Sequence, residues 1–523
     1  MKRKMKEICA LSLCATMAVG MLGGCGTKDD GQGKSAEGKT VEGKTYNGVD
    51  VSEHVDVKMY LLGDRTPDFD EVYGEINKVL EEKLNCSLSV DFLSWGEHDK
   101  KYSLLFSSQE DFDLIFTASS WGHYEQTVSL GGFYPMSEEF IQTNAPEIWD
   151  TVSEVGWNQA KVDGNIYMVP NNQTEFSQDV LAVRGDLMEQ FGIDDISTWE
   201  KLREFYEKCA ANGVYAGMGG PWYQYFNAKG MTTVGGAPKG GELVLYHTQD
   251  PKDLDFTYLL DWDGFTEYCK EVKALADAGA WSADALNTTE ERQTGLLTGR
   301  TAGMIWNLGS CRTYAKQANS EHPEWNVTLV DPCADLPKKA NSYINNGMAI
   351  NMNSKNPERA MMVLNELYTN QELQDLTALG IEGKHWEAVE DKQYKLLDQS
   401  GFGVDNNCNW GWKNDEVKRE EYIEERTALD DTYDTLLEGF QNNRKEEHPY
   451  DGFNFNTNNV TTQVAAVEAA VDTYYAPLIN GLVDDVDKSV EDLRAALESA
   501  GIRDVLAEMD KQAAEYIADK QAE

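Results

Sequence analysis

The chain has 523 residues, and its 90 acidic and 46 basic side chains give a formal net charge of −44. This balance argues against a nucleic-acid partner, because nucleic-acid phosphates bind to cationic patches. The length is enough for two or three domains, and the 13 Trp and 24 Tyr residues are a large supply of flat apolar rings.

The N-terminus has the pattern of a secretory signal. Residues 2–6 carry four cations, and the following run from Ile8 to Met21 has no charge. This run is shorter than the ~20 residues that a membrane-spanning helix needs, so we interpret residues 1–24 as a signal peptide rather than a transmembrane start.

The signal ends in Leu22-Gly23-Gly24-Cys25, which resembles the lipobox of bacterial lipoproteins. The resemblance implies cleavage before Cys25 and lipidation of that cysteine, and two acyl chains hold a protein durably on a membrane. Repeated Gly-Lys pairs follow, so residues 25–50 are predicted to be the lipid anchor and a flexible tether. No later uncharged run has spanning length, so lipid is the only predicted anchor.

The later cysteines are scattered singly along the chain. They form no Cys-x-x-Cys pair, and no histidine stands at the spacing of a metal ligand, so the sequence predicts neither a zinc site nor a dense disulfide framework. Buried thiols are the simplest interpretation, although export across the membrane leaves a disulfide open. The six residues are Cys86, Cys209, Cys269, Cys311, Cys333 and Cys408.

A βαβ unit is predicted near the start of the mature chain. Apolar residues alternate over 55–61 and again over 88–92, as in strands, and recur at spacings of three and four over 69–84, as on one face of a helix. The two strands of such a unit run parallel. The apolar run at 111–117 is predicted to be an interior strand of the same parallel sheet.

The rest of the chain alternates predicted helices and strands. Helices are predicted over 199–209 and 264–278, with a glycine-rich loop region between them. The segments RTAGMIWNLGS and WNVTLVDP each contain a predicted strand, a further helix begins near Pro357, and helices dominate the last 60 residues. No internal repeat of solenoid type is present, which disfavours a structural or adhesive surface protein.

Four stretches occur in a characteristic order: FDLIFTASSWGHYEQTVSLGGFYPMSEEF, KVDGNIYMVP, VRGDLMEQFGIDDISTWEKLREFYEKC and GLLTGRTAGMIW. In this order they resemble the family 1 extracellular solute-binding proteins, the lipid-anchored receptors of bacterial ABC importers for sugars. Each motif is weak alone, but together they extend along almost the whole mature chain.

The last third of the chain points to one branch of that family. LGIEGKHW and the segment that begins DGFNFNTNNVTTQVAAVEAAV resemble the Lpl-type lipoproteins, which have an extra helical C-terminal region. Some relatives carry an aspartate-rich calcium loop after the proline of the DGxIYxxP run. Asn171-Asn172-Gln173 stands there in this chain, so no metal is predicted, and no cofactor is expected.

The resemblance implies an α/β, two-lobe periplasmic-binding-protein-like fold of type II with extra C-terminal helices. Lobe one is expected over 53–172 plus 335–390, and lobe two over 173–334 plus 391–523. The ligand would lie between the lobes, at the carboxyl ends of strands, and a hinge motion would close the lobes around it.

A sugar offers hydroxyls that donate and accept hydrogen bonds and a face of C–H groups, so its receptor needs aromatic rings beside polar side chains. Ser119, Ser120, Trp121 and Tyr124 directly follow the apolar run that ends at Thr117. The other candidate ligand-binding residues follow strands or lie in glycine-rich and turn segments, and they are Trp95, Trp222, Tyr223, Trp306, Asn307, Glu382, Trp386 and Trp410.

Each candidate aromatic residue has an alternative place in the hydrophobic core, since most aromatic side chains of a large protein are buried. His385 is predicted to be structural rather than an acid–base group, and Arg184 with Asp186 to brace the start of a helix. Three tryptophans on helical patterns are assigned to the core: Trp149, Trp157 and Trp262.

The predicted function is capture of a carbohydrate, an oligosaccharide, by a monomer on the outer face of the bacterial cytoplasmic membrane and its delivery to an ABC transporter permease. The rival hypothesis is a lipid-anchored glycoside hydrolase, which needs two carboxylates about 5 to 9.5 Å apart. The many acidic residues leave that pair open, but the sequence contains no nucleophile elbow, zinc-binding His pair or P-loop, so no enzyme is predicted.

Overall fold

The computed structural model describes residues 41–119, 121–162, 164–176, 178–238, 243–288, 290–390, 392–404, 406–443 and 448–522, without the side chains of Asp99 and residues 519–522. The predicted signal peptide, Cys25 and the tether up to residue 40 lie outside these residues. In the part of the chain that is described, no helix has both the length and the apolar character needed to cross a bilayer.

Lobe one is built on a five-stranded sheet with the order β4-β3-β5-β15-β8. The strands β3 (Val55–Leu62), β4 (Cys86–Leu93) and β5 (Leu114–Thr117) run parallel, whereas β15 (Gly347–Ile350) lies antiparallel between β5 and β8 (Val169–Pro170). The predicted βαβ unit and the interior position of β5 are confirmed. The sheet is mixed rather than parallel, because the chain enters β15 at the edge where β5 ends.

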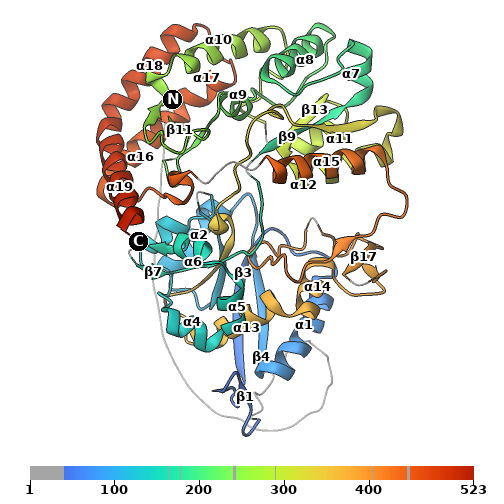
Figure 1. Ribbon diagram of the computed structural model, residues 1–523, viewed down its shortest axis with the longest axis vertical. Helices are drawn as coiled ribbons and strands as arrows, with labels where there is room; N and C mark the ends of the chain where they lie inside the picture. The colour runs from blue at the N-terminus through green and yellow to red at the C-terminus, as the bar shows by residue number, and fades with distance from the viewer. Residues whose placement is uncertain are drawn as a thin grey trace, which may run out of the picture. The chain divides into compact units, whose positions relative to one another are not determined.

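Helices cover this sheet (Figure 1). The helix α1 (Phe69–Leu84) joins β3 to β4, and its apolar residues at spacings of three and four are buried in the lobe-one core. The other helices of lobe one are α2 (His98–Ser107), α3 (Tyr124–Ser129), α4 (Glu138–Asn144), α5 (Pro146–Thr151), α6 (Glu154–Gln159), α13 (Pro357–Thr369) and α14 (Gln371–Leu379). The short strands β6 (Lys161–Val162) and β7 (Asn165–Ile166) form a hairpin.

The predicted tether to residue 50 is wrong at its C-terminal end. There β1 (Thr45–Tyr46) and β2 (Val49–Asp50) pair as a hairpin, and the Tyr46 hydroxyl donates to Glu366 Oε1 at 3.0 Å. Both turn residues, Asn47 and Gly48, have positive φ, which is the conformation that an Asn-Gly hairpin turn requires. The segment therefore belongs to lobe one, and its glycine serves a turn.

Lobe two contains a three-stranded sheet with β9 (Asp179–Arg184) between β13 (Gly303–Asn307) and β14 (Val327–Val330), both antiparallel to it. Leu181 and Val183 face one hydrophobic cluster, and Val180 and Ala182 face another, because successive side chains of a strand point to opposite faces. A second sheet consists of β10 (Met231–Thr233), β11 (Val244–His247) and β12 (Phe256–Tyr258).

The predicted helices at 199–209 and 264–278 are confirmed as α8 (Trp199–Ala211) and α10 (Asp263–Asp277). The segment between them contains α9 (Trp222–Ala228) and β10 where only loop was predicted, because a helix of seven residues between glycines gives little periodic signal. The other helices are α7 (Gly185–Phe191), α11 (Arg292–Leu297), α12 (Leu308–Glu321), α15 (Ala428–Asn442), α16 (Thr461–Ala470), α17 (Ala476–Ile479), α18 (Val486–Ala500) and α19 (Ile502–Ala522).

The predicted C-terminal helices are confirmed. The helices α16, α18 and α19, drawn in red in Figure 1, lie beside one another, and α18 also packs on α10. Val490, Leu493 and Leu497 of α18 are buried in the same cluster as the apolar face of α10. The extra C-terminal helices therefore extend the core of lobe two.

The lobe boundary expected at residue 390 is too early. The strands β16 (Trp386–Ala388), β17 (Gln393–Leu396) and β18 (Glu420–Glu421) form a small sheet. Between them, Phe402, Cys408 and Trp412 belong to the lobe-one core, and Trp412 Nε1 donates to Thr377 Oγ1 at 3.2 Å. An irregular segment has no periodicity to show which core its side chains enter.

Three segments therefore connect the lobes: residues 171–176 with 178, residues 331–342, and residues 413–427. Asn172 in the first forms a bridge with Asn414 in the third, and their side chains are joined by a 3.0 Å hydrogen bond. Phe176 forms a bridge with Ala340 in the second. The three connections are neighbours, and we refer to them together as the hinge region.

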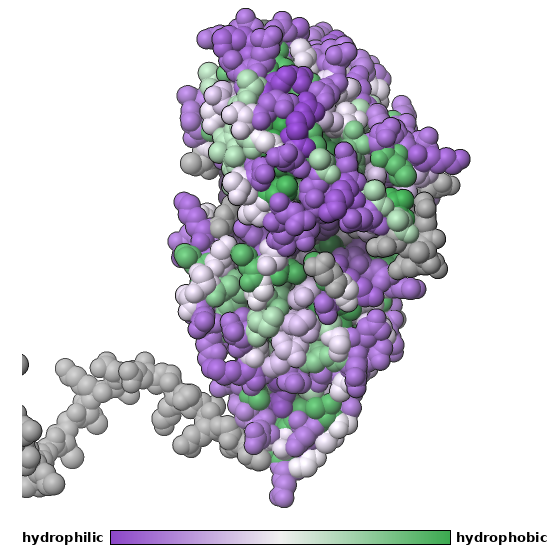
Figure 2. Space-filling view, turned by 90° about the vertical axis from the view of Figure 1, so that its left-hand side faces the viewer, coloured by the Kyte–Doolittle hydropathy of each residue, from purple (hydrophilic) through white to green (hydrophobic). Residues whose placement is uncertain are grey.

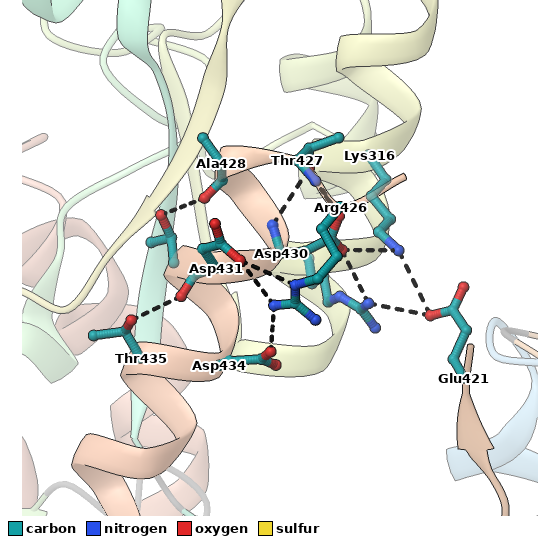
Figure 3. Close-up of polar contacts among 11 residues, drawn as sticks. Lys316, Glu421, Arg426, Thr427, Ala428, Asp430, Asp431, Asp434 and Thr435 are labelled. Carbon is teal, nitrogen blue, oxygen red and sulfur yellow. Dashed lines mark hydrogen bonds and ion pairs between the residues drawn. The ribbon is translucent and has the colours of Figure 1, made fainter. Parts of the chain in front are cut away.

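The helices α12 and α15 are joined by a buried ionic cluster (Figure 3). Arg312 and Lys316 of α12 each contact Asp430 Oδ1 at 3.1 Å, and the Asp430 side chain is only 2% exposed. Burial by itself raises the pKa of Asp430, but hydrogen bonds from Thr427, Lys316 and Arg312 outweigh burial and hold that pKa far below its ordinary value.

The protein surface follows the acidic composition. Figure 2 shows a face that is mostly hydrophilic, with hydrophobic residues gathered in small separate groups. Small apolar groups are normal on a protein surface and by themselves indicate no partner.

Candidate ligand-binding site

Two exposed tryptophans meet at one edge of the lobe-one sheet. Trp95 follows the end of β4 and Trp121 follows the end of β5. Since β3, β4 and β5 are parallel, their carboxyl ends lie at the same edge, and the two rings stack with centroids 6.2 Å apart. Trp95 is 55% exposed and Trp121 is 38% exposed, although apolar rings of this size are usually buried.

A third ring joins them from a distant part of the chain. The Trp410 ring lies 5.4 Å from that of Trp95, and its backbone oxygen accepts a 2.7 Å hydrogen bond from Asn171 in the hinge region. Its loop fits closely, because a Cβ on Gly63 would lie 2.6 Å from Cys408 Sγ and one on Gly411 would lie 2.4 Å from Met348 Sδ. We call Trp95, Trp121 and Trp410 the tryptophan platform.

Polar groups lie directly beside this platform. Ser119 Oγ donates to Glu125 Oε1 at 2.7 Å, and the Ser119 backbone N–H donates to the Ile344 oxygen at 2.9 Å. Trp121 Nε1 donates to the Asn345 oxygen at 3.1 Å, which fixes the orientation of its ring. Ser120, predicted with them, lies outside the described residues.

A second group of candidates lies on lobe two, at the edge from which β9 begins and where β13 ends. Trp306 is half-buried, its ring is nearly parallel to that of Tyr314 at 6.2 Å, and the Arg292 guanidinium lies 4.6 Å from its centroid. Asn307 caps α12 by accepting from the Ser310 backbone N–H at 2.8 Å. Asn307 therefore stabilises the start of α12 in addition to lying at this edge.

Asp179 lies opposite Asn307 in the register of this sheet. Burial raises the pKa of Asp179 to about 6, and the nearby Arg292 acts in the opposite direction. Asp179 therefore adds a carboxyl group to the edge of lobe two that holds Trp306 and Asn307. The sequence candidates did not include this group.

Three predicted ligand contacts are wrong because their side chains are buried in the core. Tyr124 is fully buried and its hydroxyl donates to the Ala160 oxygen at 2.7 Å. Trp222 is 2% exposed among the aromatic rings around α9 and α10, and Trp386 is 3% exposed with its Nε1 bonded to the Gly380 oxygen. Burial of a large aromatic side chain is strongly favourable, so these rings enter the core although their residues lie near turns.

Tyr223 and Glu382 are exposed, but neither joins the platform. The Tyr223 ring packs 5.2 Å from that of Phe226 on α9, and Glu382 lies in a surface turn. Both remain predictions for ligand contact.

The residues predicted to be structural are confirmed in that role. His385 is 1% exposed and lies between Asp68 and the Ile381 backbone N–H, at 3.1 and 2.9 Å. Arg184 and Asp186 form a two-point ion pair at the start of α7. The remaining tryptophans predicted for the core pack against it: Trp149, Trp157 and Trp262.

Two polar residues beside the platform were missed from the sequence. Glu125 follows Tyr124 on α3, and Asn454 comes from the C-terminal part of lobe two and donates to Ser119 Oγ at 3.0 Å. The alternation of the segment GFNFN, with Phe453 and Phe455 buried and Asn454 between them, was the available signal.

Asn171, Asn172 and Gln173, which stand where some relatives carry a calcium loop, make contacts between the first and third connections. Gln173 Nε2 donates to Asp415 Oδ1 at 3.3 Å, and Asn171 Oδ1 accepts from the Lys413 backbone N–H at 3.2 Å. Within the described ranges, no three His, Cys, Asp or Glu side chains are grouped so as to hold a metal ion.

The six cysteines of the described ranges are buried free thiols, as the simplest interpretation predicted. Burial raises the pKa of the thiols, to about 12 for Cys86 and well above its ordinary value for Cys269, so they remain protonated at neutral pH.

Two cavities lie elsewhere in lobe two. One, of about 410 Å³, is lined by Tyr215, Asp284 and Arg300 among others, and lies at the opposite end of β13 from Trp306. The other, of about 300 Å³, lies between α8 and α10. Neither is lined by a predicted ligand-binding residue.

Comparison with protein families gives two matches. The family described as bacterial extracellular solute-binding protein matches residues 66–374, which is more than half of the chain, and a domain of unknown function (DUF3502) matches residues 449–518. A curated relative, a carbohydrate ABC transporter substrate-binding protein of Streptococcus pneumoniae serotype 4, is 26% identical over 486 residues, which cover 89% of this chain and 91% of that protein.

Solved structures share the fold. The N-glycan transport solute-binding protein NgtS from Streptococcus pneumoniae has a TM-score of 0.68 at 22% identity, with 89% of this chain and 99% of that chain covered, and is also solved with Man1GlcNAc. An HMO-binding, ABC-transporter-associated solute-binding protein from Bifidobacterium longum infantis has a TM-score of 0.62 at 13% identity, with 88% and 99% covered. The two-lobe fold is therefore that of solute-binding proteins.

Proposed function

The chain belongs to the family of bacterial extracellular solute-binding proteins, and we propose that it captures an oligosaccharide between its two lobes and delivers it to an ABC transporter. The single observation that carries this proposal is the tryptophan platform. Three rings from distant segments are gathered at the carboxyl ends of parallel strands, and two of them, those of Trp95 and Trp121, are exposed in part.

The chemistry of the platform fits a carbohydrate. Flat aromatic faces pack against the C–H face of a sugar ring, while its hydroxyls need neighbouring donors and acceptors. Ser119, Glu125 and Asn454 provide these beside Trp121. Rings with centroids 5.4 and 6.2 Å apart offer surface to more than one sugar unit, which favours an oligosaccharide over a single sugar.

The names of relatives agree with this substrate class. The curated relative is named a carbohydrate transporter component, and NgtS has been solved with two mannose-containing glycans. The formal charge of −44 disfavours uronates, which are themselves anionic, so we propose a neutral glycan.

We further propose that Cys25 is acylated and anchors the protein on the outer face of the cytoplasmic membrane. The lipobox-like Leu22-Gly23-Gly24-Cys25 follows a signal-like segment, and two acyl chains suffice for a durable anchor. The partner of the ligand-bound form would be a permease subunit that engages both lobes.

The test is isothermal titration of the purified chain against a panel of neutral and acidic oligosaccharides, with chromatography of the sugar afterwards. We expect heat of binding with at least one neutral glycan, which is recovered intact. Release of shorter sugars at a catalytic rate would instead support the rival glycoside hydrolase, and no binding to any glycan would contradict the substrate class.

A further inference from the structure

Asn454 lies on lobe two between two residues whose side chains are buried in the core of that lobe. Phe453 and Phe455 are 5% and 1% exposed in the lobe-two core, so the side chain between them points away from that core. The Phe455 backbone N–H donates to the Gly235 oxygen at 2.9 Å, and a Cβ on Gly235 would lie 2.6 Å from the Phe453 oxygen. The position of Asn454 is therefore fixed by its own lobe.

The Asn454 side chain nevertheless makes its hydrogen bonds with lobe one. Its Nδ2 donates to Ser119 Oγ at 3.0 Å and also to Glu125 Oε1. Ser119 in turn donates to Glu125 Oε1 at 2.7 Å, so the three side chains form a closed triangle across the two lobes. Hydrogen bonds to a carboxylate acceptor are among the stronger ones in proteins.

This triangle is coupled to the tryptophan platform. The Trp121 backbone N–H donates to the Ser119 oxygen at 2.9 Å, and the Ser119 N–H donates to the Ile344 oxygen of the lobe-one core, just after the second connection. Ser119 therefore contacts both the platform and Asn454 of lobe two.

We propose that Asn454, Ser119 and Glu125 form an interlobe latch that favours the closed, ligand-holding arrangement of the lobes. The inference rests on the proposed function and adds to it a residue of the C-terminal DUF3502 region as a determinant of affinity. Because opening at the hinge region draws the two sheet edges apart, it removes both acceptors from Asn454. The latch thus raises the population of the closed form, and with it the apparent affinity for ligand.

Exchange of donor and acceptor provides the test. Asn454→Asp places a second carboxylate beside Glu125 and breaks the latch, whereas adding Glu125→Gln returns a donor to the pair and restores a hydrogen bond. We expect Asn454→Asp to raise the Kd for the glycan identified by titration roughly tenfold. The double variant should return the Kd to within about threefold of the unmodified value.

The lobes can also be followed without ligand. Spin labels on Lys78→Cys in α1 and Lys270→Cys in α10 report an interlobe distance in a chain in which Cys9, Cys14 and Cys25 are replaced by Ser, since the six remaining native thiols are buried. We expect a longer or broader distance distribution for Asn454→Asp and its recovery in the double variant.

The matched control is Asn459→Asp. Asn459 Nδ2 donates to Glu508 Oε1 at 2.7 Å, so this variant creates the same repulsion within lobe two and should leave the interlobe distance unchanged. An unchanged distance distribution in Asn454→Asp, or no recovery in the double variant, would overturn the latch. If no glycan binds, the proposed substrate class fails, but the distance measurement still decides whether the latch exists.

Discussion

Several separate contacts fix the orientation of the Trp121 ring. Its ring packs against Phe116 and Trp95, with centroids 5.5 and 6.2 Å away, and its Nε1 is bonded to a backbone oxygen, yet 38% of the residue remains exposed. A ring that is ordered before ligand arrives loses little conformational entropy on binding. Trp121 is therefore prepared for stacking.

Replacing Trp121 by Ala should weaken glycan binding at least tenfold, about 1.4 kcal/mol, because the sugar loses an ordered stacking surface. Trp306→Ala on lobe two should have an effect of the same size. Isothermal titration of each variant checks these values. Tyr474→Ala, a similar truncation at an exposed ring of the C-terminal helical region, serves as the control and should leave the Kd unchanged. Unchanged affinity in both tryptophan variants would contradict the assignment of Trp121 and Trp306 to the binding site.

At the level of elements, the N-terminus of α15 is held by basic side chains of another helix, α12. Its N-terminus has a capping box between Thr427 and Asp430, and the same carboxylate meets Arg312 and Lys316 of α12. The exposed Arg426 contacts Asp431 and Asp434 on the outer side of the helix (Figure 3). The buried and exposed pairs thus lie within one helical turn, which permits a direct comparison.

Asp430→Asn should destabilise lobe two by about 3 kcal/mol, because it removes the buried one of the two carboxylates that Arg312 and Lys316 share and leaves them only the more exposed Glu421. Asp431→Asn, at a side chain that is 70% exposed, should cost less than about 1 kcal/mol. Thermal unfolding followed by circular dichroism measures both. Equal midpoints for the two variants would contradict the importance of the buried cluster.

The effect of Asp430 should also depend on pH. Since the folded-state pKa is lowered, the stabilisation is present above the unfolded value of about 3.9 and is lost as the pH falls toward the folded one. The difference between the unmodified chain and Asp430→Asn should therefore be full at pH 7 and shrink progressively below pH 4. A difference independent of pH would show that packing, not charge, causes the loss.

On the scale of the whole molecule, the two lobes have separate cores joined by three neighbouring connections and the Asn454 contacts. A ligand bound between them contacts both lobes and stabilises the folded form by mass action. At a glycan concentration of 100 times Kd the gain is about 2.7 kcal/mol, which should raise the thermal midpoint by several degrees.

Differential scanning calorimetry with and without the glycan measures that rise. Trp121→Ala at the same glycan concentration is the control, and its rise should be smaller because its Kd is larger. A glycan that binds by titration but raises the unfolding transition of only one lobe would contradict a site that involves both lobes.

Local patterns in the sequence were enough for the elements that have a clear apolar repeat. The periodicities of 55–61, 69–84 and 88–92 predicted β3, α1 and β4, because a strand or helix with one buried face repeats its apolar residues at a fixed spacing. The same reasoning failed for α9 and for the hairpin at Thr45–Asp50, where the elements are too short to repeat.

Within the sequence, apolar spacing predicted α/β elements and the place of aromatic residues after strands β4 and β5, because spacing is a local property. The order of motifs along the chain carried the family resemblance, and the two-lobe fold was inferred from that resemblance. Only the tertiary structure decided that Trp410 joins Trp95 and Trp121 while Tyr124, Trp222 and Trp386 enter the core. It alone brought Asn454 to Ser119, more than 300 residues away. The distant segments that pack around a side chain decide whether a ring is buried and which lobe an amide contacts. The spacing of residues in the sequence does not contain this information.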